Sequence, residues 1–132
     1  TDPGDDGAVV RRESALADGP AAISILVAES GPARLHASLE IVRDARALAV
    51  GARTLEAALV VFEHQDVDLV LVGEGFDHGR ALDVPRAGPG CLCVLVSDRP
   101  RALRADEAAW FRRLVSRPLT CAQVEALIAG CT

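Results

Sequence analysis

The sequence DLVLV at residues 68–72 decides the fold, because its first residue, Asp68, is followed by a continuous apolar run that ends at Gly73. A strand inside a parallel sheet is buried on both faces and therefore carries no polar residue at alternate positions. A helix of the same apolar character would need a longer run than this one. We therefore predict a buried central strand at residues 68–72.

Four more apolar runs of strand length lie on either side of this segment, and amphipathic stretches separate them. We predict strands in the runs at residues 23–28, 47–50, 91–96 and 114–116. Between them, apolar residues at helical spacing predict helices that begin near Pro32, Thr54 and Thr120. Ser30 and Thr54 are expected to cap the first two, and Thr120 with Gln123 has the pattern of a capping box.

The two remaining helices are predicted with different lengths. Residues 105–112 read as one regular helix, whereas the glycines and prolines of residues 73–90 leave at most two turns near residues 77–84. Strands that alternate with helices through short loops predict an α/β fold. We expect a doubly wound five-stranded parallel sheet with helices on both faces and a short or irregular third helix.

Composition limits the domain organisation and the partners. The 132 residues suit one domain, which we place at residues 22–132, after a flexible linker or tail at residues 1–21 that is rich in Gly, Pro and Asp. The net charge of −5 and the lack of a long apolar run predict a cytoplasmic domain with no nucleic-acid or membrane partner. The four cysteines are expected as buried free thiols and the three histidines in surface or capping roles, with no metal and no cofactor.

The carboxyl ends of the strands are where ligands bind in a doubly wound sheet. Glu29 and Ser30 follow the first strand, Gly73 the third, Ser97 and Asp98 the fourth, and Arg117 the fifth. In this order and spacing, residues 25–30, 68–73, 94–97 and 116–119 resemble the receiver family of response regulators. The resemblance extends over nearly all of residues 23–129 and implies the receiver fold.

This resemblance also implies a phosphorylation site, whose residues the sequence changes. In receivers an aspartate accepts the phosphoryl group, an acidic pair holds magnesium, and a lysine pairs with the product. Here Gly73 stands at the acceptor position, Ser30 replaces one of the acids, and Arg117 replaces the lysine. Leu114 stands at the usual aromatic position. We therefore expect a pseudo-receiver without catalytic residues, and so no enzyme.

The retained residues have simpler interpretations as well. We expect Glu29 to be a solvated loop acid, with an ion pair to Arg117 as the alternative. Ser97 is expected to bond a loop amide. Residues 73–79, with Asp98 further on, also resemble a dinucleotide-binding fingerprint, but with one residue too many. We expect those glycines to form an irregular loop instead.

The last third of the chain is the predicted partner surface, because it combines arginines with an aromatic residue. Its candidate residues are Arg101, Arg104, Trp110, Arg112 and Arg113. Phe111 is expected in the core. Our leading hypothesis is a phosphorylation-independent regulatory interaction domain of a two-component protein, such as a hybrid histidine kinase or response regulator. It would dock on a neighbouring kinase or output domain, or on a separate signalling protein.

Two other functions remain open at this stage. The arginines of the last third could hold an anionic nucleotide such as cyclic di-GMP, which would make the domain a small-ligand sensor. A dinucleotide-binding enzyme fragment is the third hypothesis, and only the glycine-rich segment supports it.

Overall fold

The computed structural model describes residues 23–88 and 90–131, so the predicted linker at residues 1–21 lies outside the described residues. In chain order the elements are β1 (Ser24–Ala28), α2 (Pro32–Asp44), β2 (Leu48–Ala52), α3 (Leu55–His64), β3 (Leu69–Gly73), α4 (Phe76–Gly79), α5 (Asp83–Ala87), β4 (Leu92–Ser97), α6 (Ala105–Ala108), β5 (Arg113–Ser116) and α7 (Cys121–Cys131).

The five strands form one parallel sheet in the order β2-β1-β3-β4-β5. All five residues of β3 are buried, as the continuous apolar run predicted. The strand pairs on one side with β1, where Val70 lies opposite Leu26, and on the other with β4, where it lies opposite Cys93. The predicted doubly wound parallel sheet is confirmed.

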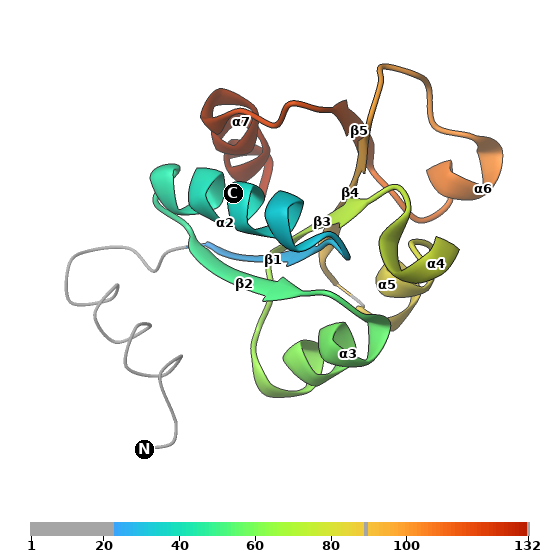
Figure 1. The fold of residues 1–132 in the computed structure, drawn as a ribbon, viewed down its shortest axis with the longest axis horizontal. Coiled ribbons are helices and arrows are strands. Elements are labelled where there is room, and N and C mark those ends of the chain that lie inside the picture. The colour runs from blue at the N-terminus through green and yellow to red at the C-terminus, as the bar shows by residue number, and fades with distance from the viewer. Residues whose placement is uncertain (1–22, 89, 132) are drawn as a thin grey trace.

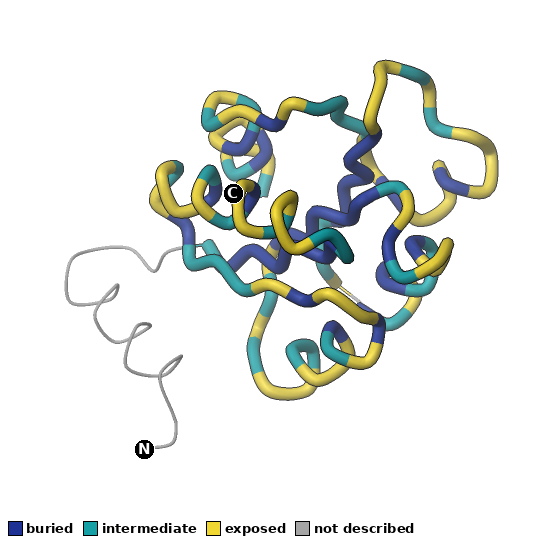
Figure 2. Tube along the Cα trace, viewed as in Figure 1, coloured by how far each residue is buried: buried dark blue, intermediate teal, exposed yellow. Residues whose placement is uncertain are grey.

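Helices cover both faces of the sheet (Figure 1). α2 and α7 pack on the face that carries Ile25, Leu71 and Val94. α3 and α5 pack on the opposite face, where Leu26 and Val70 contribute to the core. Figure 2 shows the strands as the buried centre of the molecule, with exposed residues along the outer surfaces of the helices. Because all the strands are parallel, their carboxyl ends lie together along one side of the sheet, which we call the carboxyl edge.

The predicted caps differ in outcome. The Thr54 hydroxyl accepts a hydrogen bond from the amide of Ala57 at 3.1 Å, so it caps α3. Thr120 and Gln123 form the reciprocal bonds of a capping box before α7. The cap predicted at Ser30 is wrong, because Gly31 is the amino-terminal cap of α2 and makes no side-chain bond there.

The third and fourth helical regions are both short. The third is divided into α4 and α5, as expected of an irregular helix, and its Asp77 and His78 have positive φ angles of 46° and 57°. The regular helix predicted at residues 105–112 is wrong, since α6 ends at Ala108. It cannot continue because the Arg112 amide bonds to the Cys93 carbonyl at 2.9 Å, so the chain is already joining the sheet.

The four cysteines carry free thiols. Only Cys93 among them is fully buried, and burial raises its pKa to about 12. The expectation of buried thiols is therefore correct for Cys93, while the other three are partly exposed. None of the helices in the described part of the chain is long and apolar enough to span a membrane.

Candidate functional site at the carboxyl edge of the sheet

Gly73 is the last residue of β3 and faces the carboxylate of Glu29, which follows β1. A Cβ atom at Gly73 would overlap Oε1 of Glu29 and would lie 3.0 Å from its Cδ. Positive φ among the described glycines occurs at Gly79 and Gly90, and not at Gly73. The glycine is therefore required by the close approach of Glu29 and not by the backbone conformation.

Glu29 forms an ion pair with Arg117, which lies just after β5. Oε1 of Glu29 accepts a hydrogen bond from Nη2 of Arg117, and the two side chains are only 10% and 17% exposed. The expectation of a solvated Glu29 is wrong. The reason is geometric, because the carboxyl ends of β1 and β5 face the same edge of the sheet and bring the two charges together.

Two further charges extend this pair toward the solvent. Nε of Arg117 also bonds Oδ1 of Asp98 at 3.1 Å, and the same oxygen lies 3.1 Å from Nη1 of Arg34 on α2. The four side chains therefore alternate in sign. Together with Ser30, Gly31, Glu74 and Gly75 they line a hollow of about 450 Å³. Each negative charge in the chain of four contacts a guanidinium.

Ser30 and Asp77 connect three loops behind this hollow. The Asp77 amide donates to Oγ of Ser30 at 2.6 Å, and the Ser30 hydroxyl bonds the carbonyl of Arg53 at 3.3 Å. The carboxylate of Asp77 then accepts the amide of Leu55, the first residue of α3, at 2.8 Å. Ser30 thus links the loops after β1, β2 and β3 instead of capping its own helix.

Ser97 is fully buried at the end of β4 and bonds an acid that follows β3. Its hydroxyl lies 3.1 Å from Oε1 of Glu74 and accepts the amide of Arg99 at 3.3 Å. The bond to a loop amide agrees with the expectation for Ser97. Burial opposes ionisation of Glu74, but the hydrogen bond from Arg101 and other donors lower the pKa of this carboxyl below its usual value.

Arg101 is bound between two carboxylates. It bonds Glu74 at 2.9 Å and Glu107 through two nitrogens at 2.8 and 2.9 Å. The bonds from Arg101, against the cost of burial, lower the pKa of Glu107 to about 2. Arg101 was predicted to face a partner or an anionic ligand, but its guanidinium already bonds two acids of the same domain.

The other residues of the predicted partner surface are more accessible. Trp110 is 44% exposed. The guanidinium carbon of Arg86 lies over its ring, 5.5 Å from the ring centroid. Arg112 and Arg113 are exposed. Arg104 is exposed as well but reaches Glu107 at 3.0 Å. Phe111 is only 2% exposed, as expected of a core residue.

The glycine-rich segment after β3 forms no regular phosphate-binding turn. It leads into the four-residue α4, whose central residues Asp77 and His78 are left-handed. A helix this short has a weak amino-terminal dipole. Asp98, which the dinucleotide motif would place on a ribose, contacts Arg34 and Arg117 instead.

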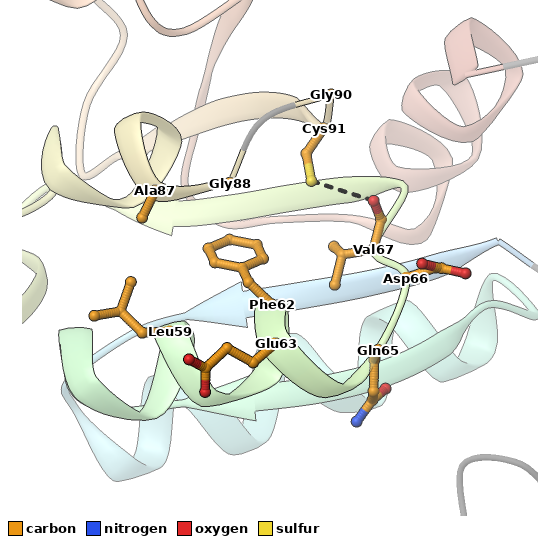
Figure 3. A pocket seen from close by; sticks show the side chains of 10 residues that line it. All are labelled: Leu59, Phe62, Glu63, Gln65, Asp66, Val67, Ala87, Gly88, Gly90 and Cys91. Carbon is orange, nitrogen blue, oxygen red and sulfur yellow. Dashed lines mark hydrogen bonds between the residues drawn. The ribbon is translucent and has the colours of Figure 1, made fainter.

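A second hollow of about 480 Å³ lies at the opposite end of the sheet, where β3 and β4 begin (Figure 3). Phe62 of α3 and Cys91 are part of its lining, and the Cys91 thiol donates to the Val67 carbonyl at 3.2 Å. A Cβ at Gly88 would lie 2.6 Å from the Phe62 ring, so glycine permits this close packing. The sequence did not predict this hollow, because it lies at the amino ends of the strands and the predicted site lies at their carboxyl ends.

Sequence reasoning also missed the roles of Glu74, Asp77 and Glu107. Glu107 lies three residues after Arg104 and accepts that residue's amide at 2.8 Å, a spacing that could have indicated a helix cap. Glu74 and Asp77 lie in an irregular loop, where no periodic pattern predicts which way a side chain points.

Comparisons with known proteins identify the fold class. Neither the family models nor the curated proteins gave a match to this sequence. Among solved structures, the chain is similar to a CheY-like receiver domain from Methylobacillus flagellatus, with a TM-score of 0.76 and 15% identity over 85% of this chain and 100% of that one.

Two other matches come from multidomain or kinase contexts. One is the receiver domain of a sensor histidine kinase from Pseudomonas aeruginosa with magnesium in its active-site cleft, at TM-score 0.67 and 18% identity over 83% of this chain and 97% of that one. The other is the amino-terminal domain of a response regulator/sensory box/GGDEF protein from Carboxydothermus hydrogenoformans. Its TM-score is 0.65, with 16% identity over 82% of this chain and 92% of that one. The chain has the fold of receiver domains of two-component signalling proteins.

A magnesium ion like the one in the Pseudomonas aeruginosa domain would find few free ligands among the residues present at this edge. Magnesium needs carboxylate oxygens that are free to coordinate it. The carboxylate of Glu29 is matched by Arg117, and Ser30 Oγ is occupied by the Asp77 amide and the Arg53 carbonyl. Within residues 23–88 and 90–131 no three His, Cys, Asp or Glu side chains gather as a metal site.

Proposed function

We propose that this chain is a phosphorylation-independent regulatory interaction domain of a two-component signalling protein. The observation that carries the proposal is the Glu29–Arg117 ion pair beside Gly73. The acceptor position has no carboxylate, and the space that its side chain would need is taken by the carboxylate of Glu29. The receiver fold supports the signalling context.

The remaining carboxyl-edge residues support a site of fixed geometry. The Ser97 hydroxyl donates a hydrogen bond to Glu74, and Glu74 also accepts one from Arg101. Arg101 is anchored in turn by the buried Glu107. These groups satisfy one another, so the edge requires no phosphoryl group to complete its hydrogen bonds.

The proposed partner surface consists of Trp110, Arg112 and Arg113. It lies at or just before β5, which is an outermost strand of the sheet, and all three residues are exposed. Arg112 and Arg113 form no ion pair with any residue in the described ranges, so they can pair with acids of another domain. We propose that the partner is a neighbouring kinase or output domain, or a separate signalling protein, with an acidic docking face.

The first test concerns phosphate. The purified 132-residue protein is incubated with acetyl phosphate and magnesium and its intact mass is measured, beside a receiver that has an aspartate at the acceptor position. We expect a mass increase of one phosphoryl group in the control alone. A stable increase in this protein, located to any residue of the carboxyl edge, would refute the proposal.

The second test concerns docking. Arg112→Glu with Arg113→Glu should weaken regulation of the protein that contains this domain, because both charges of the surface are reversed. The matched control is Arg43→Glu, an exposed residue in the last turn of α2. Unchanged regulation in a doubly reversed protein with a normal melting temperature would show that this surface is not the docking site.

A further inference from the structure

A groove between α2 and the segment after β5 has the properties of a ligand site. Its volume is about 420 Å³, and small-molecule pockets range over roughly 300–1,000 Å³. It lies on the α2 side of the sheet, whereas Trp110 is found with the α6 segment at the β5 end. The groove shares no lining residue with the docking surface proposed above, and the inference stands whether or not the domain accepts phosphate.

Aliphatic side chains form most of the groove surface. Ala37 and Ile41 line it from α2, and Pro118 and Leu119 line it from the opposite side. This lining contains no aromatic ring for stacking and no amide side chain for reading a nucleobase. It suits an aliphatic body and does not suit a cyclic nucleotide.

Ser38 contributes a buried hydroxyl to the groove. It is only 6% exposed, on the face of α2 that lines the groove. Among the residues that the structure describes, none bonds the Ser38 hydroxyl. Buried hydroxyl groups in proteins nearly always have a hydrogen-bond partner. An acceptor atom of a bound molecule would provide one.

The charges of the groove are all positive. Arg34 and Arg117 line it, and it has no acidic lining residue. Arg117 already forms ion pairs with Glu29 and Asp98. Arg34 is 55% exposed, and in the described part of the chain its single ion pair is with the exposed Asp98. Such a pair contributes little to stability, so an anion can replace it.

We propose that this groove binds a small aliphatic monocarboxylate. Its hydrocarbon body lies against Ile41 and Leu119, and its carboxylate accepts hydrogen bonds from the guanidinium of Arg34 and the hydroxyl of Ser38. Arg34 and Arg117 also line the hollow at the carboxyl edge. Binding therefore alters the charge balance around Asp98 and carries a metabolite signal to that edge.

The test uses octanoate, octanol and octylammonium, which share an aliphatic chain and differ in the charge of the head group. Each is titrated into the 132-residue protein while backbone amide NMR signals are followed. We expect saturable shifts centred on Ser38, Ile41 and Leu119 with octanoate. Octanol should bind at least tenfold more weakly, because it lacks the charge-assisted bonds, and octylammonium should not bind.

Variants distinguish this site from general hydrophobic adsorption. Arg34→Gln should weaken octanoate binding about tenfold, since a hydrogen bond to a charged group contributes that much, whereas Arg43→Gln on the same helix should not. Ala37→Trp should block the groove without unfolding the protein, because Ala37 is exposed.

The proposal is overturned if octanoate causes no saturable shifts at the groove, or if octanol binds as tightly as octanoate. The second result would mean that the groove recognises the aliphatic chain alone and not a carboxylate. Equal octanoate affinity in Arg34→Gln and Arg43→Gln would also overturn it, because the carboxylate would then not be recognised.

Discussion

Gly73→Asp introduces the side chain that the proposed correspondence with receivers places at this position, and the structure predicts that it destabilises the protein. The new Cβ overlaps Oε1 of the nearly buried Glu29. Forcing additional atoms into a packed site costs about 1–3 kcal/mol. Two carboxylates about 4 Å apart repel by about 4 kcal/mol at an effective dielectric of 20, and Arg117 offsets part of this. We expect a total loss of about 3–5 kcal/mol.

Gly73→Asn is the matched control, because it has nearly the same shape as the aspartate and no charge. It should lose only the packing part, about 1–3 kcal/mol. Urea unfolding of both variants at pH 7 separates the two contributions. The aspartate variant should still take up no phosphoryl group from acetyl phosphate, since Ser30 and Arg117 are unchanged. Equal stability of the two variants would show that the new carboxylate does not repel Glu29, and efficient phosphorylation of Gly73→Asp would show that Glu29 does not block the position.

Three more outcomes follow from burial and from charge. Trp110→Ala should cost less than about 1 kcal/mol of stability in urea unfolding, because the ring is half exposed and loses one contact with a cation. Phe111→Ala should cost about 3–5 kcal/mol, because Phe111 is buried in the core. Similar losses in the two variants would contradict these placements. The low pKa of Glu107, about 2 against an ordinary 4.5, gives stability that is present above pH 4.5 and is lost as the pH falls toward 2. Arg101→Gln should flatten that part of the pH profile in urea unfolding, and an unchanged profile would argue against the ion pair. Cys93, whose pKa is raised to about 12, should react with iodoacetamide at pH 8 only after unfolding, and mass spectrometry of labelled peptides would detect any earlier reaction.

The sheet could be predicted because its signals are local and repeated. The apolar run of β3 requires burial on both faces, and Thr54 and Thr120 mark helix starts through bonds that span three residues. The error at α6 has a tertiary origin. Helical spacing continues past Ala108, but pairing of Arg112 with Cys93 of β4 overrides it.

The site could be predicted in its location but not in its contacts. Strand order places Glu29 and Arg117 at one edge, and the sequence allowed both a solvated acid and an ion pair. The choice depends on side-chain directions that follow only from the packed fold. The same holds for Arg101, whose guanidinium is enclosed by acids that lie 27 and 6 residues away in the chain.

The bridge from Ser30 through Asp77 to Leu55 has a mechanical consequence. Three loops from separate βα units share one hydroxyl and one carboxylate, so a displacement of one loop strains the other two. The three loops therefore move as one unit, and this corner of the domain keeps nearly the same shape.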